Sequence, residues 1–216
     1  MVNDAYLAQL ASDVYNPGQH GEVLQVGPFL VELIHSPEYT IGVFQGSNEI
    51  LDWIYNIDSI KMDHPKGGMV HEGFYRAFLH LKDELAKLAG PFIWTGHSLA
   101  GAMAILAGIE FDRVIKVVTF GCPRVGNARF NKLITFPVTQ YHCGIDPVPL
   151  IPSLFWGFRH CCAPKWFNGT SWGKFGFWGW VRCVLNASIH LKLGHTAIFS
   201  HLMFNYLKNL GPNESV

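Results

Sequence analysis

One serine stands in a sequence context that can make it a nucleophile. Residues 92–102 read FIWTGHSLAGA, an apolar run followed by a Gly-His-Ser turn and an alanine-rich segment. This order predicts a strand, a tight turn and a helix, and in that setting a Gly-x-Ser-x-Gly motif presents its hydroxyl above the edge of a sheet. Gly96 is one of the two small residues that let strand and helix pack closely, and Ala100 stands where the second glycine is usual. Because serine is also a preferred helix cap, capping is the ordinary alternative for Ser98.

A nucleophilic serine needs an acid and a base, which follow it in the order Ser, Asp or Glu, His in this class of motif. Four carboxylates lie beyond Ser98: Glu110, Asp112, Asp146 and Glu214. The first two end the helix that begins at the serine, and the last follows every histidine. Asp146 comes after a predicted strand, at the end where open α/β sheets place their sites. Elimination therefore favours Asp146 as the acid, and a turn residue before a proline is the ordinary alternative.

The candidates for the base are the histidines that follow Asp146: His160, His190, His195 and His201. The first comes soon after the acid and the second lies in an alternating run, so we interpret both as structural. His201 precedes a predicted amphipathic helix over residues 202–210, and a junction between loop and helix can present its ring. His195 lies on a predicted loop. We favour His201 and keep His195 as the alternative; a packed core histidine is the ordinary interpretation of either ring.

The elements that must position these residues alternate between strand-like and helix-like patterns. The expected strands cover residues 23–34, 39–44, 92–95, 114–120 and 138–143. The expected helices cover residues 73–88, 99–108 and 127–134, and a first helix has Ala5, Leu7, Ala8, Leu10 and Ala11 on its inner side. Alternation of this kind predicts a mostly parallel sheet covered by helices on both faces. We expect a single α/β domain over residues 1–216.

The composition excludes several classes of protein. The 216 residues include 16 Lys and Arg against 16 Asp and Glu, and 49% of them are hydrophobic. These values argue against intrinsic disorder and give no support to nucleic-acid binding. The histidines lack paired ligand spacing, so we expect no metal and no cofactor. The five cysteines are an odd number, two of them adjacent, and we expect them to be mostly reduced.

The sequence also bears on location. Residues 1–15 have no basic segment and carry Asp4 and Asp13, which is not typical of a signal peptide. The longest apolar stretch, residues 175–185, is short and is interrupted by two glycines and an arginine, so it does not predict a membrane span. We therefore expect a soluble protein that is cytoplasmic or leaderless and has no stable membrane insertion.

Several segments match one family in the same order along the chain. They are Phe44-Gln45-Gly46-Ser47, Asp52-Trp53-Ile54, Val70-His71-Glu72-Gly73-Phe74, residues 95–102, residues 119–127, Asp146-Pro147-Val148-Pro149, and His201 with Asn205-Tyr206-Leu207. With them the chain resembles the class 3 lipases, the fungal-type triacylglycerol lipase family of the α/β-hydrolase fold. It departs from the family pattern at Gln45, where arginine is usual, at Ala100, and at Ser200, where many relatives have aspartate.

The resemblance implies a catalytic triad of Ser98, Asp146 and His201. It also implies an oxyanion hole made by the backbone N–H groups of Ser47 and Leu99, with the Ser47 hydroxyl as a third donor. Each such donor lowers the barrier by about 3 kcal/mol, because it stabilises the developing alkoxide.

The resemblance further implies a lid within residues 47–58. Trp53 and Ile54 of this segment, together with His97, are assigned to lid and substrate contacts. Movable lids exclude water and gate access to the site. The alternative for this segment is an amphipathic helix that stays packed on the body of the protein.

The stretch between Asp146 and His201 carries five tryptophans: Trp156, Trp166, Trp172, Trp178 and Trp180. It predicts the wall of an acyl pocket or a rim at a lipid interface, and core packing of an extended loop is the alternative. Charge is also unevenly divided, because residues 1–100 carry 12 acidic and 5 basic residues and residues 101–216 carry 11 basic and 4 acidic residues. We hypothesise that the basic half meets an anionic lipid surface.

These expectations combine into one predicted function, a serine carboxylic ester hydrolase that cleaves acylglycerol esters through an acyl-enzyme intermediate. Its expected partner is a lipid or other ester substrate, met at a transient lipid–water interface. A phospholipase A1, a short-chain esterase and a lipase-like protein that binds without turnover remain the alternatives.

Overall fold

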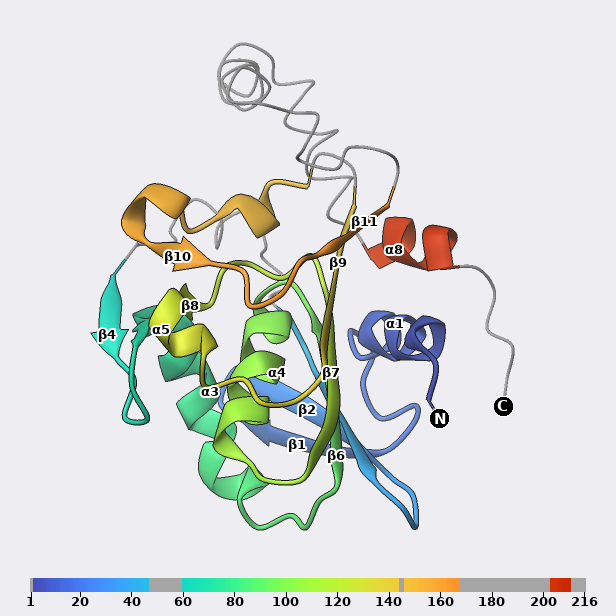
Figure 1. Ribbon diagram of the computed structural model, residues 1–216. Helices are drawn as coiled ribbons and strands as arrows, with labels where there is room; N and C mark the ends of the chain where they lie inside the picture. The colour runs from blue at the N-terminus through green and yellow to red at the C-terminus, as the bar shows by residue number, and fades with distance from the viewer. Residues whose placement is uncertain (1, 47–59, 144–145, 168–202, 211–216) are drawn as a thin grey trace.

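The computed structural model describes residues 2–46, 60–143, 146–167 and 203–210, and its main element is a seven-stranded sheet (Figure 1). In spatial order the strands are β1 (Glu22–Val26), β2 (Phe29–His35), β3 (Thr40–Phe44), β6 (Phe92–His97), β7 (Val114–Phe120), β9 (Val138–Cys143) and β11 (Lys165–Phe167). The strands from β3 to β11 run parallel, whereas β1 and β2 extend the sheet as antiparallel neighbours. The carboxyl ends of the parallel strands lie at the top of Figure 1.

Helices cover both faces of this sheet. On one face α1 (Asp4–Asp13) packs against α8 (Met203–Leu210); on the other lie α3 (Glu72–Leu85), α4 (Leu99–Glu110) and the short α5 (Ala128–Asn131) (Figure 1). Each face has its own hydrophobic core. The arrangement confirms the expected mostly parallel sheet flanked by helices.

The burial of α4 explains why the chain after Ser98 is apolar. Every residue from Leu99 to Ile109 is buried, because α4 lies between the sheet and α3. A helix buried on all sides needs apolar residues around its whole circumference. By contrast α3 is amphipathic, and its buried residues are Phe74, Tyr75, Ala77, Phe78, Leu81 and Leu85.

A smaller antiparallel sheet lies beside the main one. Its strands are, in spatial order, β10 (Phe158–Arg159), β8 (Gly126–Asn127), β5 (Met69–His71) and β4 (Lys61–Asp63). Two short 3-10 turns, η1 (Val148–Leu150) and η2 (Leu154–Trp156), precede β10. This sheet therefore ties the segment that follows β9 to the segment that precedes α3.

Two expected elements were wrong. The run expected as one strand over residues 23–34 is two strands, because Gly27 has φ 58° and turns the chain between β1 and β2. Glycine adopts this conformation without steric cost. The helix expected over residues 127–134 is limited to Ala128–Asn131, capped by the Asn127 side chain, which accepts from Phe130 N at 2.8 Å.

Candidate active site

Ser98 lies on a sharp turn between β6 and α4. Its backbone has φ 61° and ψ −129°, a conformation that non-glycine residues rarely adopt. Neighbouring strand and helix hold it there: Ser98 N donates to Phe120 O at 2.9 Å, and Gly101 N donates to Ser98 O at 3.0 Å. No described residue forms a hydrogen bond with Ser98 Oγ, and Ser98 makes no side-chain cap for α4. The geometry therefore matches a strained nucleophile turn and differs from an ordinary helix cap.

The turn tolerates Ala100 because its neighbours have no side chain. A Cβ added to Gly96 would lie 2.6 Å from the backbone C and O of Ala100 and 2.8 Å from its methyl group. A Cβ added to Gly101 would lie 2.9 Å from Cys122 Cβ. Strand and helix are thus already in close contact with Ala100 in place, and Gly96 is the position that has no room to change.

Asp146 follows β9 at the carboxyl end of the sheet, and several groups hold its carboxylate. The side chain is buried, with 1% of the residue exposed. Its Oδ1 accepts from Val148 N at 2.9 Å, and its Oδ2 accepts from the Tyr206 hydroxyl at 2.6 Å. Hydrogen bonds of this kind to a buried carboxylate are charge-assisted and fix its orientation.

Tyr206 is a residue whose role sequence reasoning missed. It lies on α8, is fully buried, and donates to Asp146 across the fold. Burial and the neighbouring Asp146 carboxylate raise the pKa of Tyr206 well above its usual value, so the phenol stays a neutral donor. Its sequence signal was the Asn205-Tyr206-Leu207 match, which was counted as part of a motif without a role for the tyrosine.

His97, the residue before the serine, has its described contacts with other aromatic side chains. It is 4% exposed, its Nδ1 lies 3.2 Å from the Tyr15 hydroxyl, and its ring centroid lies 5.9 Å from that of Tyr206. Burial raises the pKa of Tyr15 to about 12, so this phenol is also neutral. Tyr206 therefore contacts both Asp146 and the residue before Ser98, and these two predicted site residues lie at the same end of the sheet.

The expected oxyanion segment begins at the end of β3, where Gln45 replaces the usual arginine. Gln45 N donates to Leu30 O at 2.9 Å, and its side-chain Nε2 donates to Val14 O at 2.9 Å. A Cβ added to Gly46 would lie 2.5 Å from the Tyr15 hydroxyl. Gln45 thus anchors the segment to the end of α1 with one neutral hydrogen bond.

Several predicted site residues lie outside the described part of the chain: Ser47, Trp53, Ile54, His195 and His201. Leu99 is described, and it is the first residue of α4, where helix N–H groups have no partner within the helix. Glu110, excluded above as the acid, is bound instead by Lys82 at 2.7 Å. His160, interpreted as structural, has its Nε2 2.8 Å from Pro149 O.

The fold, with its sharp turn at Ser98 before a buried helix, is of the α/β-hydrolase type. Residues 41–156 match the family described as Lipase (class 3), which is more than half of the chain. The chain belongs to the class 3 lipase family.

Two relatives illustrate the similarity. "Secreted mono- and diacylglycerol lipase 1" of Fusarium solani is 34% identical over 149 residues, which are 58% of this chain and 43% of that protein. "Secreted mono- and diacylglycerol lipase LIP4" of Malassezia restricta is 29% identical over 180 residues, 70% of this chain and 59% of that protein. The chain thus spans about half the length of the curated relatives it matches.

The fold resembles that of solved fungal lipases. The native propeptide complex of Rhizomucor miehei lipase aligns with a TM-score of 0.67 at 22% identity, over 76% of this chain and 67% of that one. The lipase of Rhizopus microsporus var. chinensis aligns with a TM-score of 0.63 at 22% identity, over 79% and 77% of the two chains.

The expected cytoplasmic location was wrong. It is contradicted by relatives of this chain that are named secreted lipases. Residues 4–13 form α1, whose Leu7, Ala8, Leu10 and Ala11 are buried in the core. Their pattern therefore reflects packing inside the folded protein and carries no information on export. Within the described residues, no helix is long and apolar enough to cross a bilayer.

Proposed function

We propose that this protein is a serine carboxylic ester hydrolase that cleaves acylglycerol esters. The observation that carries the proposal is the strained turn at Ser98, with a buried Asp146 at the same end of the sheet. The names of the relatives, mono- and diacylglycerol lipases, support the substrate class. We also propose that residues 1–216 form one domain and that the substrate is met at a lipid–water interface.

In the proposed mechanism Ser98 Oγ attacks the ester carbonyl. His201 takes the proton from Ser98 and returns it to the leaving alcohol, which yields an acyl-enzyme that water then hydrolyses. Asp146 holds the imidazole in the required tautomer and stabilises the imidazolium that forms. The N–H groups of Ser47 and Leu99 stabilise the developing oxyanion, with the Ser47 hydroxyl as a third donor.

The choice of His201 over His195 is supported by distance along the chain. Tyr206 of α8 contacts Asp146, and α8 is described from Met203 onward. Two residues of extended chain span at most about 7 Å, so His201 stays close to this helix. Eight residues of extended chain reach about 28 Å, so the same argument does not tie His195 to the acid.

Residues beside the serine complete the proposal. Trp53 and Ile54 belong to a lid over the nucleophile, and His97 contributes to the substrate side of the site. The dense packing of His97 against Tyr15 and Tyr206 supports a role in shaping this side of the site. The lid is tested by measuring hydrolysis rates below and above the concentration at which the substrate aggregates. A lid that opens at the interface predicts a sharp rise in rate at this concentration, whereas a helix that stays packed predicts none.

A series of p-nitrophenyl esters, from acetate to palmitate, tests the activity. Wild type should hydrolyse several members of the series, and Ser98→Ala should lose this activity at every chain length. A wild-type protein inactive on the whole series, or a variant that keeps its rate, would overturn the proposal. Replacing His201 and His195 by alanine in separate variants identifies the base, since only loss of the base removes most of kcat.

A further inference from the structure

The 3-10 turn η2 carries the most exposed aromatic side chain among the described residues. Leu154, Phe155 and Trp156 are 47%, 83% and 53% exposed, and we call these three residues the η2 tip. Large apolar side chains gathered on a surface commonly mark a binding site, because leaving them in water is unfavourable. Aromatic side chains such as these are favoured where a protein meets the boundary between water and lipid.

The η2 tip has a fixed shape. The Ser153 side chain accepts from Phe155 N at 3.2 Å, and Gly157 N donates to Leu154 O at 2.9 Å. Arg159 Nη1 donates to Leu154 O at 2.8 Å and to Phe158 O at 2.7 Å, so its guanidinium closes the base of the turn. The three apolar side chains are thus presented by a hydrogen-bonded turn, which limits the entropy lost when they bind.

Positive charge flanks the η2 tip. Lys61 Nζ lies 5.8 Å from the ring centroid of Phe158 and 3.9 Å from where a Cβ on Gly157 would be. Neither Lys61 nor Arg159 forms an ion pair with any residue that the structure describes. Residues 148–167 contain no Asp or Glu. The carboxylates near Lys61 are Asp63, at the far end of β4, and Glu72, whose N donates to Ile60 O and whose side chain is paired with Arg76.

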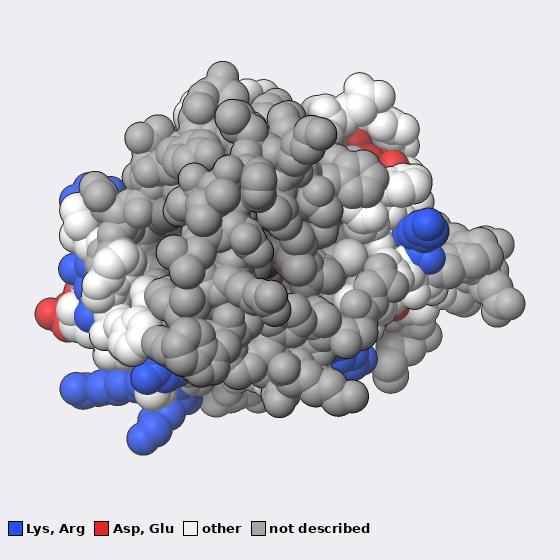
Figure 2. Space-filling view, turned by 90° about the horizontal axis from the view of Figure 1, so that it is seen from above, with Lys and Arg blue, Asp and Glu red and all other residues white. Residues whose placement is uncertain are grey.

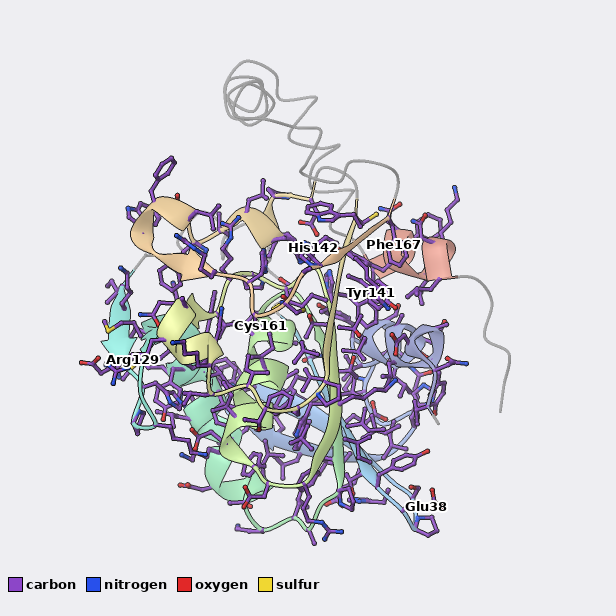
Figure 3. All side chains as sticks on the ribbon, in the orientation of Figure 1. Glu38, Arg129, Tyr141, His142, Cys161 and Phe167 are labelled. Atoms are coloured by element: carbon purple, nitrogen blue, oxygen red, sulfur yellow. The ribbon has the colours of Figure 1, made fainter. Side chains whose placement is uncertain are left out.

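The figures show the surroundings of η2 and β10. η2 and β10 lie at the upper left of Figure 1, at the end of the sheet where the parallel strands finish. In the view from above, Lys and Arg atoms border a white surface at the left edge of this face, with red Asp or Glu atoms among them (Figure 2). Arg129, labelled in Figure 3, adds a further exposed cation from α5 on the same side. The described part of this edge thus combines exposed apolar side chains with several cations.

We propose that the η2 tip, with Lys61 and Arg159, docks this protein on the surface of an anionic phospholipid membrane. The aromatic side chains enter the boundary between headgroups and acyl chains, and the cations contact the phosphates. Each Lys or Arg near such a surface strengthens binding about fivefold, and salt weakens this contribution. Docking here presents the Ser98 end of the sheet to the lipid. The docking itself does not require the proposed function; only the statement that the lipid is the substrate rests on it.

Sedimentation with vesicles tests the docking separately from catalysis. The full chain is mixed with vesicles of phosphatidylcholine alone or of phosphatidylcholine with phosphatidylglycerol. Three variants are compared with wild type: Phe155→Ser/Trp156→Ser, which removes the aromatic side chains; Lys61→Gln, which removes one charge and leaves the turn intact; and Leu79→Ser/Ile115→Ser, which removes two exposed apolar residues elsewhere. Hydrolysis of a soluble p-nitrophenyl ester is measured for each.

The expected result is a preference for the vesicles that contain phosphatidylglycerol. The aromatic double variant should lose at least about tenfold in binding, because burial of each large side chain contributes strongly. Lys61→Gln should lose about fivefold, only on the anionic vesicles. The Leu79/Ile115 control should bind as wild type does, and soluble-ester hydrolysis should stay unchanged in Lys61→Gln and in this control.

Three outcomes would overturn the docking. The first is equal binding of wild type to both kinds of vesicle, and the second is wild-type binding by the aromatic double variant. The third is no vesicle binding at all, the result expected if the η2 tip instead docks an acidic protein. If wild type binds vesicles as expected but does not hydrolyse esters, the proposed function is contradicted and the membrane-docking site is still supported.

Discussion

Ser98 and Asp146 lie at the same end of one sheet, yet different parts of the chain position them. The turn at Ser98 is built from β6, α4 and the end of β7, and its closest packing involves Gly96 and Ala100. The Asp146 carboxylate is held by Tyr206, which lies 60 positions further along the chain on α8. The position of Ser98, the proposed nucleophile, thus depends on local backbone and small residues, whereas that of Asp146, the proposed acid, depends on the docking of a distant helix.

This difference has consequences for stability. The turn at Ser98 is part of the central core, so its geometry is lost only when β6 and α4 separate. The acid is fixed by side-chain contacts on the other face, where α1 and α8 pack together. We therefore expect local opening to affect Asp146 before it affects Ser98, since regions with fewer buried contacts open at lower free energy.

The largest expected effect is on the acid itself. Asp146→Asn keeps the size of the side chain and removes its charge, so kcat on a soluble ester should fall about 10⁴-fold if Asp146 holds the base. Asp112→Asn is the matched control, because Asp112 is exposed. A kcat for Asp146→Asn within a few fold of wild type would remove Asp146 from the catalytic site.

The next effect is expected at the turn. Gly96→Ala places a methyl group 2.6 Å from the backbone of Ala100, so strand and helix must separate. Such overpacking costs about 1–3 kcal/mol, and the shift should also misplace Ser98 and lower kcat. Chemical denaturation and ester kinetics measure the two effects.

Ala100→Gly is the control for this change. It removes a methyl group without new contacts, so kcat should be retained. A Gly96→Ala variant with wild-type stability and kcat would show that the turn is not constrained by this contact.

Much of the fold and part of the site could be predicted from the sequence, for a physical reason. Motifs such as residues 92–102 combine a buried strand, a turn and a buried helix in adjacent positions, so local pattern is sufficient to predict the structure there. The hairpin of β1 and β2 was missed because Gly27 and Pro28, a dipeptide typical of turns, were counted within a single strand.

Contacts between distant residues could not be predicted in this way. Nothing in the spacing of Tyr206 and Asp146 indicates that they form a hydrogen bond, since the contact depends on how α8 packs against β9. The same holds for the Gln45 side chain and Val14 O, because either partner alone is an ordinary surface or loop group.

The contact between Tyr206 and Asp146 is the next prediction. Tyr206→Phe removes the hydroxyl and leaves the ring in place, so a positioning role predicts a fall in kcat of about tenfold with KM unchanged. Stability should fall by about 1.5–3 kcal/mol, as expected for loss of a hydrogen bond to a charged group.

Tyr141 supplies the matched control for Tyr206. Its hydroxyl donates to Asp4 at 2.9 Å, again from a tyrosine to a carboxylate, but to the first residue of α1 and not to Asp146. Tyr141→Phe should lower stability without changing kcat. Equal kinetic effects of the two variants would mean that Tyr206 is only structural.

The smallest expected effect concerns pH and the segment that follows Asp146. Burial, with the charge of Arg124, lowers the pKa of His160 to about 3, and burial also lowers the pKa of His142, whose ring centroid lies 4.7 Å from that of His160. The unfolded chain takes up a proton on His160 near pH 6.5, whereas the folded protein does so only near pH 3. The contribution of neutral His160 to the free energy of unfolding is therefore fully present above pH 6.5. It is lost as the pH falls through this window, by at most about 1.4 kcal/mol per pH unit.

This pH effect separates the two regions. His160 Nε2 lies 2.8 Å from Pro149 O, so its protonation strains the segment after Asp146, whereas α4 contains no ionisable side chain before Glu110. Hydrogen exchange at pH 5 should therefore show earlier loss of protection in residues 148–160 than in α4. His160→Gln should flatten the dependence of stability on pH, and the exposed His35→Gln should not. An unchanged slope in His160→Gln, or simultaneous exchange in both segments, would mean that acid does not act through the region that carries Asp146.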